Sequence, residues 1–435
     1  MNFSGISLQQ SPPYFVTIKF FITAPLFLLL CGILLIYGDL GGNASDFAIY
    51  NSFKSLAFMH SMTLGFMLFS MLGALQQMLP VLGGVNIKYA TSFSHLAYFS
   101  AIFGSMSVIF GFNFSMTNLL FFGSLIMLFS AIFFASVVVF KLFRANFTTH
   151  TIKGMIIATI FLPLVVFCGV LLAHFYAFGE FFGGVWTLLA DLNPFDFLQN
   201  LHVKSAIFGW IFLLIVAVSY QVLPMFYVAP DYHKNFRRFF VPLTAFIVVL
   251  SAFFDFFSLI LQVLAIIYGI YNIRILKARK RKNSIDTTIR YWYFGAICLI
   301  FGAVAGILDY LLPLFADFSH SSDQNNTLNL HYMSLFLLVF GFGGSVVSGM
   351  LYKIVPFLTW FHLSATGNFS IPSIREIIKE KYMFAQFALY CVFIASFVLN
   401  LYLGFFWVSG VILSLGALLQ LLNLILSIRV YLRFR

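Results

Sequence analysis

The chain has 435 residues, of which 62% are apolar and only 9% are charged, and its mean hydropathy is +1.00. A water-soluble core of this size cannot hide so many apolar side chains, among them 60 Phe, without leaving large exposed patches. The composition therefore excludes a soluble enzyme, and a dozen helices of roughly 20 to 25 residues leave no length for a globular domain. We interpret the net charge of +11 as a topology signal rather than as a sign of nucleic-acid binding.

Apolar stretches, separated by Gly, Pro, Asn and charge clusters, predict membrane-spanning helices along the whole chain. In chain order they cover 14–38, 55–80, 90–112, 117–141, 154–178, 203–227, 239–275, 291–315, 331–359, 382–403 and 405–428. The stretch 239–275 is too long for one upright helix, and Asp255 near its middle suits a tight hairpin, so we divide it. The sequence thus predicts an all-α integral membrane protein of twelve helices in one polytopic domain, 1–435.

Basic residues are unevenly distributed between the two sets of connections. If both termini lie in the cytoplasm, Lys54 is almost the only basic residue outside, and the inner connections and the C-terminal tail hold Lys88, Arg144, Lys153, Lys234, Arg237, Arg238, Lys277, Arg279, Lys280, Arg281, Lys282, Arg375, Lys379, Lys381, Arg429, Arg433 and Arg435. Cytoplasmic loops carry the excess of Lys and Arg in membrane proteins. We therefore expect cytoplasmic termini and a multi-pass protein of the inner (cytoplasmic) membrane, with the lipid bilayer as its surroundings.

Basic clusters also divide the chain into three units. Each cluster follows a fourth helix, at 141–144, 274–282 and 429–435, which gives units of approximately 14–146, 152–283 and 288–435. The second helix of each unit has a histidine near its outer end and a proline near its inner end: His60 and Pro80, His202 and Pro224, His331 and Pro356. The histidine-to-proline distances are 20, 22 and 25 residues. At 1.5 Å per residue, the five extra residues shift one end by about 7.5 Å unless a bulge or a longer helix absorbs them.

Three groups of four helices, with histidines on the second, sixth and tenth, resemble subunit I of the haem-copper oxidases and nitric oxide reductases. The resemblance implies that His60 and His331 are the axial ligands of one low-spin haem b, and that His202 matches a ligand of the copper or non-haem iron site. At the other half of the family's His-x-His pair this chain has Asn329, and residues 239–256 contain no histidine. The chain thus resembles a divergent member that lacks the ligands for reducing oxygen or nitric oxide.

Each histidine also has a plainer interpretation. Polar residues inside a membrane span are functional candidates, but histidines also form hydrogen bonds between helices. His174 lies at a depth similar to that of His202, and the two are a candidate pair for a metal ion such as copper. Lys204 and Asp309 are expected either to pair or to reach the outer interface separately, and Lys353 is expected to reach the inner interface as an anchor.

Three functions stay open at this point. The first is a haem-b-binding protein of respiratory type that transfers electrons or handles a small gas such as nitric oxide or oxygen. The second is an active oxidase or reductase with an atypical metal site, and the third is a copper transporter or assembly factor on the same scaffold without haem. We assign no catalytic residue, and the sequence identifies neither a redox donor nor a partner subunit.

The four cysteines show no ligand or disulfide spacing. Cys31, Cys168, Cys298 and Cys391 all lie inside apolar runs, without a CxxC pair. We predict that these side chains contribute to packing.

Overall fold

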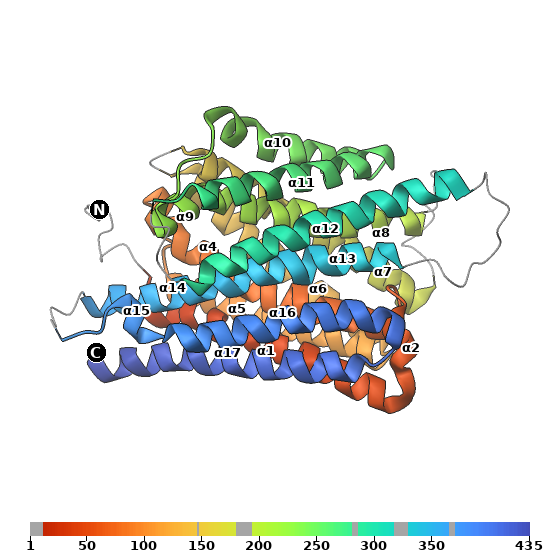
Figure 1. Ribbon diagram of the computed structural model, residues 1–435, viewed down its shortest axis with the longest axis horizontal. Helices are drawn as coiled ribbons and strands as arrows, with labels where there is room; N and C mark the ends of the chain where they lie inside the picture. Colours follow the sequence, from red (N-terminus) through yellow and green to blue (C-terminus); the bar gives the residue numbers. More distant parts are fainter. Residues whose placement is uncertain (1–11, 146–147, 180–193, 281–285, 317–328, 365–369) are drawn as a thin grey trace.

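The computed structural model describes residues 12–145, 148–179, 194–280, 286–316, 329–364 and 370–435, and all regular elements in these parts are helical (Figure 1). Eleven helices among the described residues are long and apolar enough to cross a membrane. The prediction of an all-α, multi-pass membrane protein is therefore confirmed at this level.

The helices follow one another in a simple order, in which η denotes a π-helical segment. They are α1 (Tyr14–Gly38), η2 (Asp39–Asn43), α2 (Ala44–Ala48), α3 (Phe53–His60), η3 (Ser61–Met67), α4 (Leu68–Gly83), α5 (Ala90–Asn113), α6 (Thr117–Phe143), α7 (His150–Phe178), α8 (Pro194–Lys204), η5 (Ser205–Phe212), α9 (Leu213–Tyr227), α10 (Lys234–Leu250), α11 (Phe256–Lys277), α12 (Thr287–Ala316), α13 (Leu330–Phe336), η6 (Leu337–Gly344), α14 (Ser345–Ser364), α15 (Ile374–Ile377), α16 (Glu380–Leu403) and α17 (Phe406–Phe434).

The long apolar stretch 239–275 is divided as predicted. Helix α10 ends at Leu250 and α11 begins at Phe256, so Asp255 lies in the turn between two neighbouring helices. Helix α10 has 17 residues. At 1.5 Å per residue it is about 26 Å long, slightly less than the roughly 30 Å of a hydrocarbon core. This shorter helix is the reason why eleven helices, rather than twelve, meet the length for crossing a membrane within the described residues.

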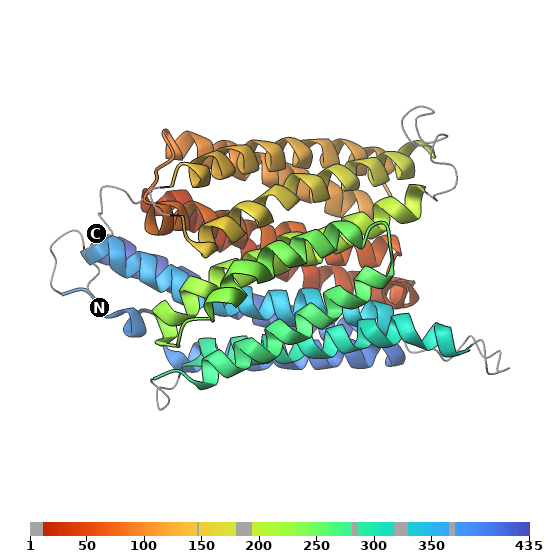
Figure 2. The ribbon, with the colours of Figure 1, turned by 90° about the horizontal axis from the view of Figure 1, so that it is seen from above.

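Three continuous helices form the centre of the bundle, and we call them the inner helices: α3–η3–α4, α8–η5–α9 and α13–η6–α14. The third of them contacts each of the other two, and all three are the most buried of the candidate spans. The other long helices surround them, with α1 beside α17, α5 beside α6, α6 beside α7 and α11 beside α12 (Figures 1 and 2). Large apolar side chains such as Phe122, Phe246 and Phe301 are exposed on this outer layer, as lipid contact requires.

Each inner helix contains a π-helical segment at the same distance from its proline. Ser61 to Pro80, Ser205 to Pro224 and Leu337 to Pro356 are all separated by 19 residues. Segments of this kind are rare and occur mostly as local insertions into α-helices, often at functional sites. The three inner helices therefore share a common register between the π-helical segment and the proline.

The three histidines do not share this register. His60 lies one residue before its π-helical segment, His202 three residues before and His331 six residues before. The π-helical segments therefore do not absorb the unequal histidine-to-proline spacing, because every inner helix has one at the same place. The difference is located at the outer ends of the helices.

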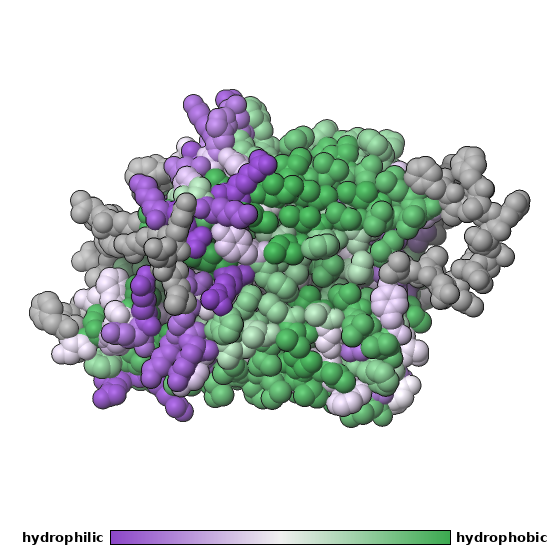
Figure 3. Space-filling view, viewed as in Figure 1, coloured by the Kyte–Doolittle hydropathy of each residue, from purple (hydrophilic) through white to green (hydrophobic). Residues whose placement is uncertain are grey.

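The first and last helices meet at one end of the bundle. Helix α1 begins and α17 ends there (Figure 1), and the rings of Tyr14 and Tyr431 stack with their centroids 3.8 Å apart. Hydrophilic residues gather at the same end on the face seen in Figure 3. Arg281 and Lys282, and the predicted unit boundaries at 146 and 283, lie outside the described residues.

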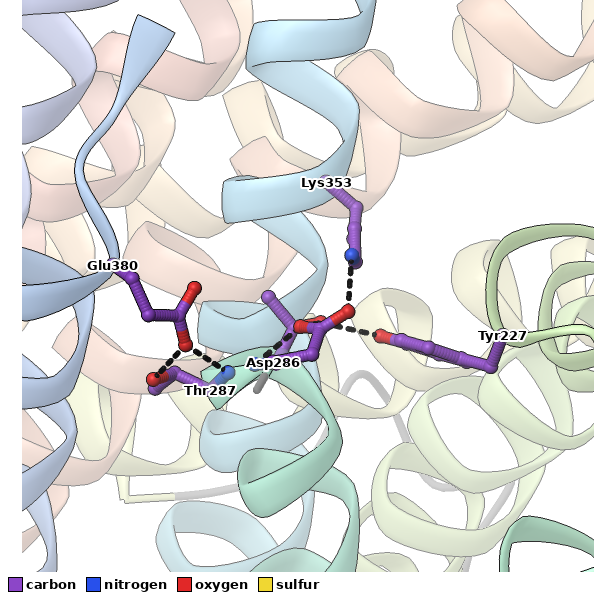
Figure 4. Close-up of polar contacts among 6 residues, drawn as sticks. Tyr227, Asp286, Thr287, Lys353 and Glu380 are labelled. Carbon is purple, nitrogen blue, oxygen red and sulfur yellow. Dashed lines mark hydrogen bonds and ion pairs between the residues drawn. The ribbon is translucent and has the colours of Figure 1, made fainter. Parts of the chain in front are cut away.

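An ion-pair network at this end joins four helices (Figure 4). The ammonium group of Lys353 on α14 lies 2.6 Å from the carboxylate of Asp286, which also accepts a hydrogen bond of 2.6 Å from the Thr288 hydroxyl of α12. Tyr227 of α9 donates to the same hydroxyl at 2.9 Å, and Glu380 of α16 accepts from the start of α12. Lys353 was expected to reach the inner interface as an anchor, and the structure shows that its ammonium group is in addition paired with Asp286.

Candidate cofactor site

A cavity of about 850 Å³ lies between the inner helices, at the end of the bundle opposite the start of α1 and the end of α17. His60, His202 and His331 all line this cavity, together with residues of α7, α11 and α12. Most of the lining is apolar, as is usual for cofactor pockets, which commonly have volumes of about 300–1,000 Å³. The structure thus brings together three of the four histidines that the sequence analysis selected.

His60 is held by its own helix. Its Nδ1 lies 2.7 Å from the carbonyl oxygen of Leu56, one turn earlier, and its ring packs against Phe112 of α5 with centroids 5.0 Å apart. A carbonyl oxygen only accepts, so Nδ1 donates and carries the proton. In the neutral ring, the lone pair is then on Nε2, the atom that a metal ion binds.

His202 is fixed in the same way, but by a neighbouring helix. Its Nδ1 donates to the carbonyl oxygen of Val165 on α7 at 2.9 Å. Gly169, one turn further along α7, makes this approach possible, because a Cβ there would lie 3.1 Å from Cε1 of the His202 ring. A larger side chain at this position would push the ring away.

The rings of His60 and His202 are neighbours in the cavity. Their centroids are 6.2 Å apart and their planes differ by 23°. The sequence paired His60 with His331 instead, because those two matched the low-spin haem positions of the family. The sequence analysis missed the contact between His60 and His202. The three histidines are at unequal distances from their prolines, so the sequence does not show which of them lie at the same depth along the bundle.

His331 lies at the mouth of the cavity. Its side chain is 48% exposed, its Nδ1 lies 3.0 Å from Oδ2 of Asp309 on α12, and its ring contacts Tyr50. Among the described residues, no ring contact joins His331 to His60. A carboxylate beside Nδ1 orients an imidazole and increases its basicity, as it does for many metal-bound histidines.

His174 faces away from the cavity. Its ring packs against Phe121 of α6 and Phe178, while its neighbours Ala173 and Tyr176 line the cavity wall. The structure therefore does not place His174 in the cavity with His202. A metal ion shared by these two residues stays a prediction.

Lys204 and Asp309, which line the same cavity, do not pair with each other. Lys204 donates to the carbonyl oxygen of Ser251 at 2.8 Å and lies 3.6 Å from the carboxylate of Asp255, whereas Asp309 is the partner of His331. Of the two alternatives for Lys204 and Asp309, a pair with each other or separate contacts, the structure shows separate partners for each. The sequence analysis used Asp255 only to place the turn after α10. Its ion pair with Lys204 was missed, although both residues were expected near the same end of the bundle.

The described residues contain no group of three or more His, Cys, Asp or Glu side chains placed to hold a metal ion. The four cysteines carry free thiols, and Cys31, Cys168 and Cys298 are buried. None of the four cysteines lines the cavity, so its possible metal ligands among the described residues are the three imidazoles and the carboxylates of Asp196, Asp255 and Asp309.

No protein-family model matches this chain, and a search of curated proteins finds no match.

Proposed function

We propose that this chain is a haem-b-binding membrane protein of respiratory type, a divergent relative of subunit I of the haem-copper oxidases, with His60 and His331 as axial ligands. The observation that carries the proposal is the shared cavity of about 850 Å³, in which three imidazoles each have Nδ1 bonded to an acceptor. No described residue hydrogen-bonds their Nε2 atoms, so these remain available for iron.

The residues of the cavity fit such a group. The Leu56 carbonyl would orient His60, and the Asp309 carboxylate would orient His331 and strengthen it as a donor. The apolar walls would exclude water from the cofactor. When bound, haem supplies a one-electron redox couple, which is the basis for electron transfer or for handling nitric oxide or oxygen.

We also propose the finer topology: twelve spans in three units of approximately 14–146, 152–283 and 288–435, with both termini in the cytoplasm and the protein in a bacterial inner membrane. The common distance of 19 residues from π-helical segment to proline supports the three units. The hydrophilic residues at the end where α1 begins and α17 ends support the orientation.

A reduced-minus-oxidised absorbance spectrum, with a pyridine haemochrome assay, tests the haem proposal on protein purified in mild detergent from a haem-replete host. We expect about one six-coordinate haem b per chain, in line with two axial imidazoles. His60→Ala and His331→Ala should lose this spectrum, while His202→Ala should keep it. Colourless wild-type protein from that host would refute the proposal.

The contact between His60 and His202 favours a second candidate, a copper-handling protein without haem. Imidazole nitrogen is a good copper ligand, and these two rings lie 6.2 Å apart with both Nδ1 atoms fixed by carbonyl oxygens. Haem-free protein should then bind copper, and His202→Ala should abolish binding while His331→Ala should not. The two single variants therefore separate the candidates.

A further inference from the structure

Five basic side chains gather where α7 and α10 begin. His150 at the start of α7 interacts electrostatically with Lys153 of the same helix and with Lys234, Arg237 and Arg238 of α10. None of the five forms an ion pair with a described carboxylate, although exposed Asp231 is only three residues before Lys234. The four Lys and Arg side chains around His150 are like charges gathered without acidic partners, and they repel one another, so an anion would stabilise this arrangement.

The backbone adds positive potential at the same place. Helices α7 and α10 are neighbours, and both begin here, with Thr149 and His233 as their N-caps. Helix N-termini carry partial positive charge and favour anions, above all phosphate. In addition, the Nε atom of Arg237 is buried and has no hydrogen-bond partner among the described residues, so one strong donor of the cluster is unsatisfied.

The part of α10 that follows the basic cluster offers an exposed apolar surface for an acyl chain. Phe239, Leu243 and Phe246 follow the basic cluster at helical spacing and are 56%, 48% and 61% exposed. The guanidinium group of Arg238 lies 5.0 Å from the centroid of the Phe239 ring, which joins the charged and apolar parts of this face. A ligand with a phosphate head and an apolar tail matches both parts at once.

We propose that the start of α7 and α10 forms a binding site for the phosphate headgroup of an anionic phospholipid, which we call the α7–α10 lipid site. The phosphate would lie among Lys153, Lys234, Arg237 and Arg238, and an acyl chain would follow the exposed face of α10. Basic residues at the cytoplasmic side of membrane helices are well suited to anionic headgroups. This site is distant in the fold from the histidine cavity, and the proposal does not depend on haem.

Native mass spectrometry and thermal melting of the full chain in mild detergent test this site, with phosphatidylglycerol, phosphatidylcholine and inorganic phosphate added separately. We expect retained phosphatidylglycerol and a raised melting temperature with that lipid alone. The triple variant Lys234→Gln, Arg237→Gln, Arg238→Gln should bind phosphatidylglycerol at least about tenfold more weakly, because each basic residue near an anionic headgroup contributes to attraction.

The matched control is the triple variant Arg429→Gln, Arg433→Gln, Arg435→Gln, which removes the same charge from the end of α17 and should bind the lipid normally. An equal loss in both triple variants would overturn the site, since it would show only a general effect of charge. If inorganic phosphate raises the melting temperature as much as phosphatidylglycerol does, the ligand of the site is a free anion and the lipid proposal is wrong. The triple variant of Lys234, Arg237 and Arg238 must elute as a single species in size-exclusion chromatography. If it does not, the double variant Lys234→Arg, Arg237→Lys serves instead, and retained binding of phosphatidylglycerol by this variant supports the site.

Discussion

Asp309 controls His331 through a single short contact at the mouth of the cavity. The carboxylate lies 3.0 Å from Nδ1, so it fixes the ring and increases the electron density on Nε2. If His331 is an axial ligand, Asp309→Asn should keep the haem but raise its midpoint potential, on the order of tens of millivolts, because a weaker donor stabilises ferric iron less. A redox titration of the purified protein measures this shift.

The control for this prediction is Asp39→Asn. Asp39 is also an acidic residue at the same end of the bundle, but it does not line the cavity, and its carboxylate accepts a hydrogen bond from the backbone N–H of Trp407. This variant should leave the potential unchanged. An unchanged potential in Asp309→Asn as well would argue against His331 as a ligand.

At the scale of elements, α1 and α17 pack so closely that two glycines are required between them. A Cβ on Gly410 would lie 2.7 Å from the carbonyl oxygen of Gly32, whereas a Cβ on Gly416 of the same helix would make an ordinary contact of 3.6 Å with Leu389. Gly410→Ala should therefore destabilise the protein by about 1–3 kcal/mol through overpacking. Gly416→Ala should be nearly neutral, and thermal melting of the two variants in detergent compares them directly.

The ion pair between Lys353 and Asp286 also joins two elements, because it connects α14 to the start of α12. Both side chains are largely buried, with exposed fractions of 21% and 16%, and Asp286 also holds the first turn of α12 through Thr288. Asp286→Asn should lower the free energy of unfolding by roughly 1–3 kcal/mol, because it leaves a buried ammonium group without its counter-charge. Melting curves should show this loss, and Asp231→Asn, an exposed carboxylate near the same end, should show none.

At the scale of the whole molecule, the proposed orientation in the membrane rests on the position of the basic residues. Under the proposed topology, Lys379→Cys lies in the cytoplasm and Asn118→Cys lies outside, and both side chains are exposed. A membrane-impermeant thiol reagent added to intact cells should label the cysteine at 118 and not the cysteine at 379. Labelling of 379 alone would reverse the orientation.

Much of the molecule could be predicted because hydropathy is a local property. The predicted stretch 14–38 coincides with α1 (Tyr14–Gly38), the hairpin at Asp255 is present, and the free cysteines lie in helices. The predicted stretch 203–227 is too short, since the inner helix already begins at Pro194 with α8, an amphipathic segment of 11 residues. The prediction of spans relied on continuous apolar stretches, and the polar residues of α8 interrupt such a stretch.

The sequence by itself determined which segments are helices, where histidines and prolines recur, and at which end the basic residues gather. Only the tertiary structure decided that His60 neighbours His202, that Asp309 is bound to His331, and that His174 faces α6. The physical reason is that successive residues of a helix are about 100° apart, so the unequal offsets of one, three and six residues before the π-helical segments leave the direction of each histidine undetermined by the sequence. Which sides meet depends on how the helices pack against one another, and packing is a property of the whole bundle.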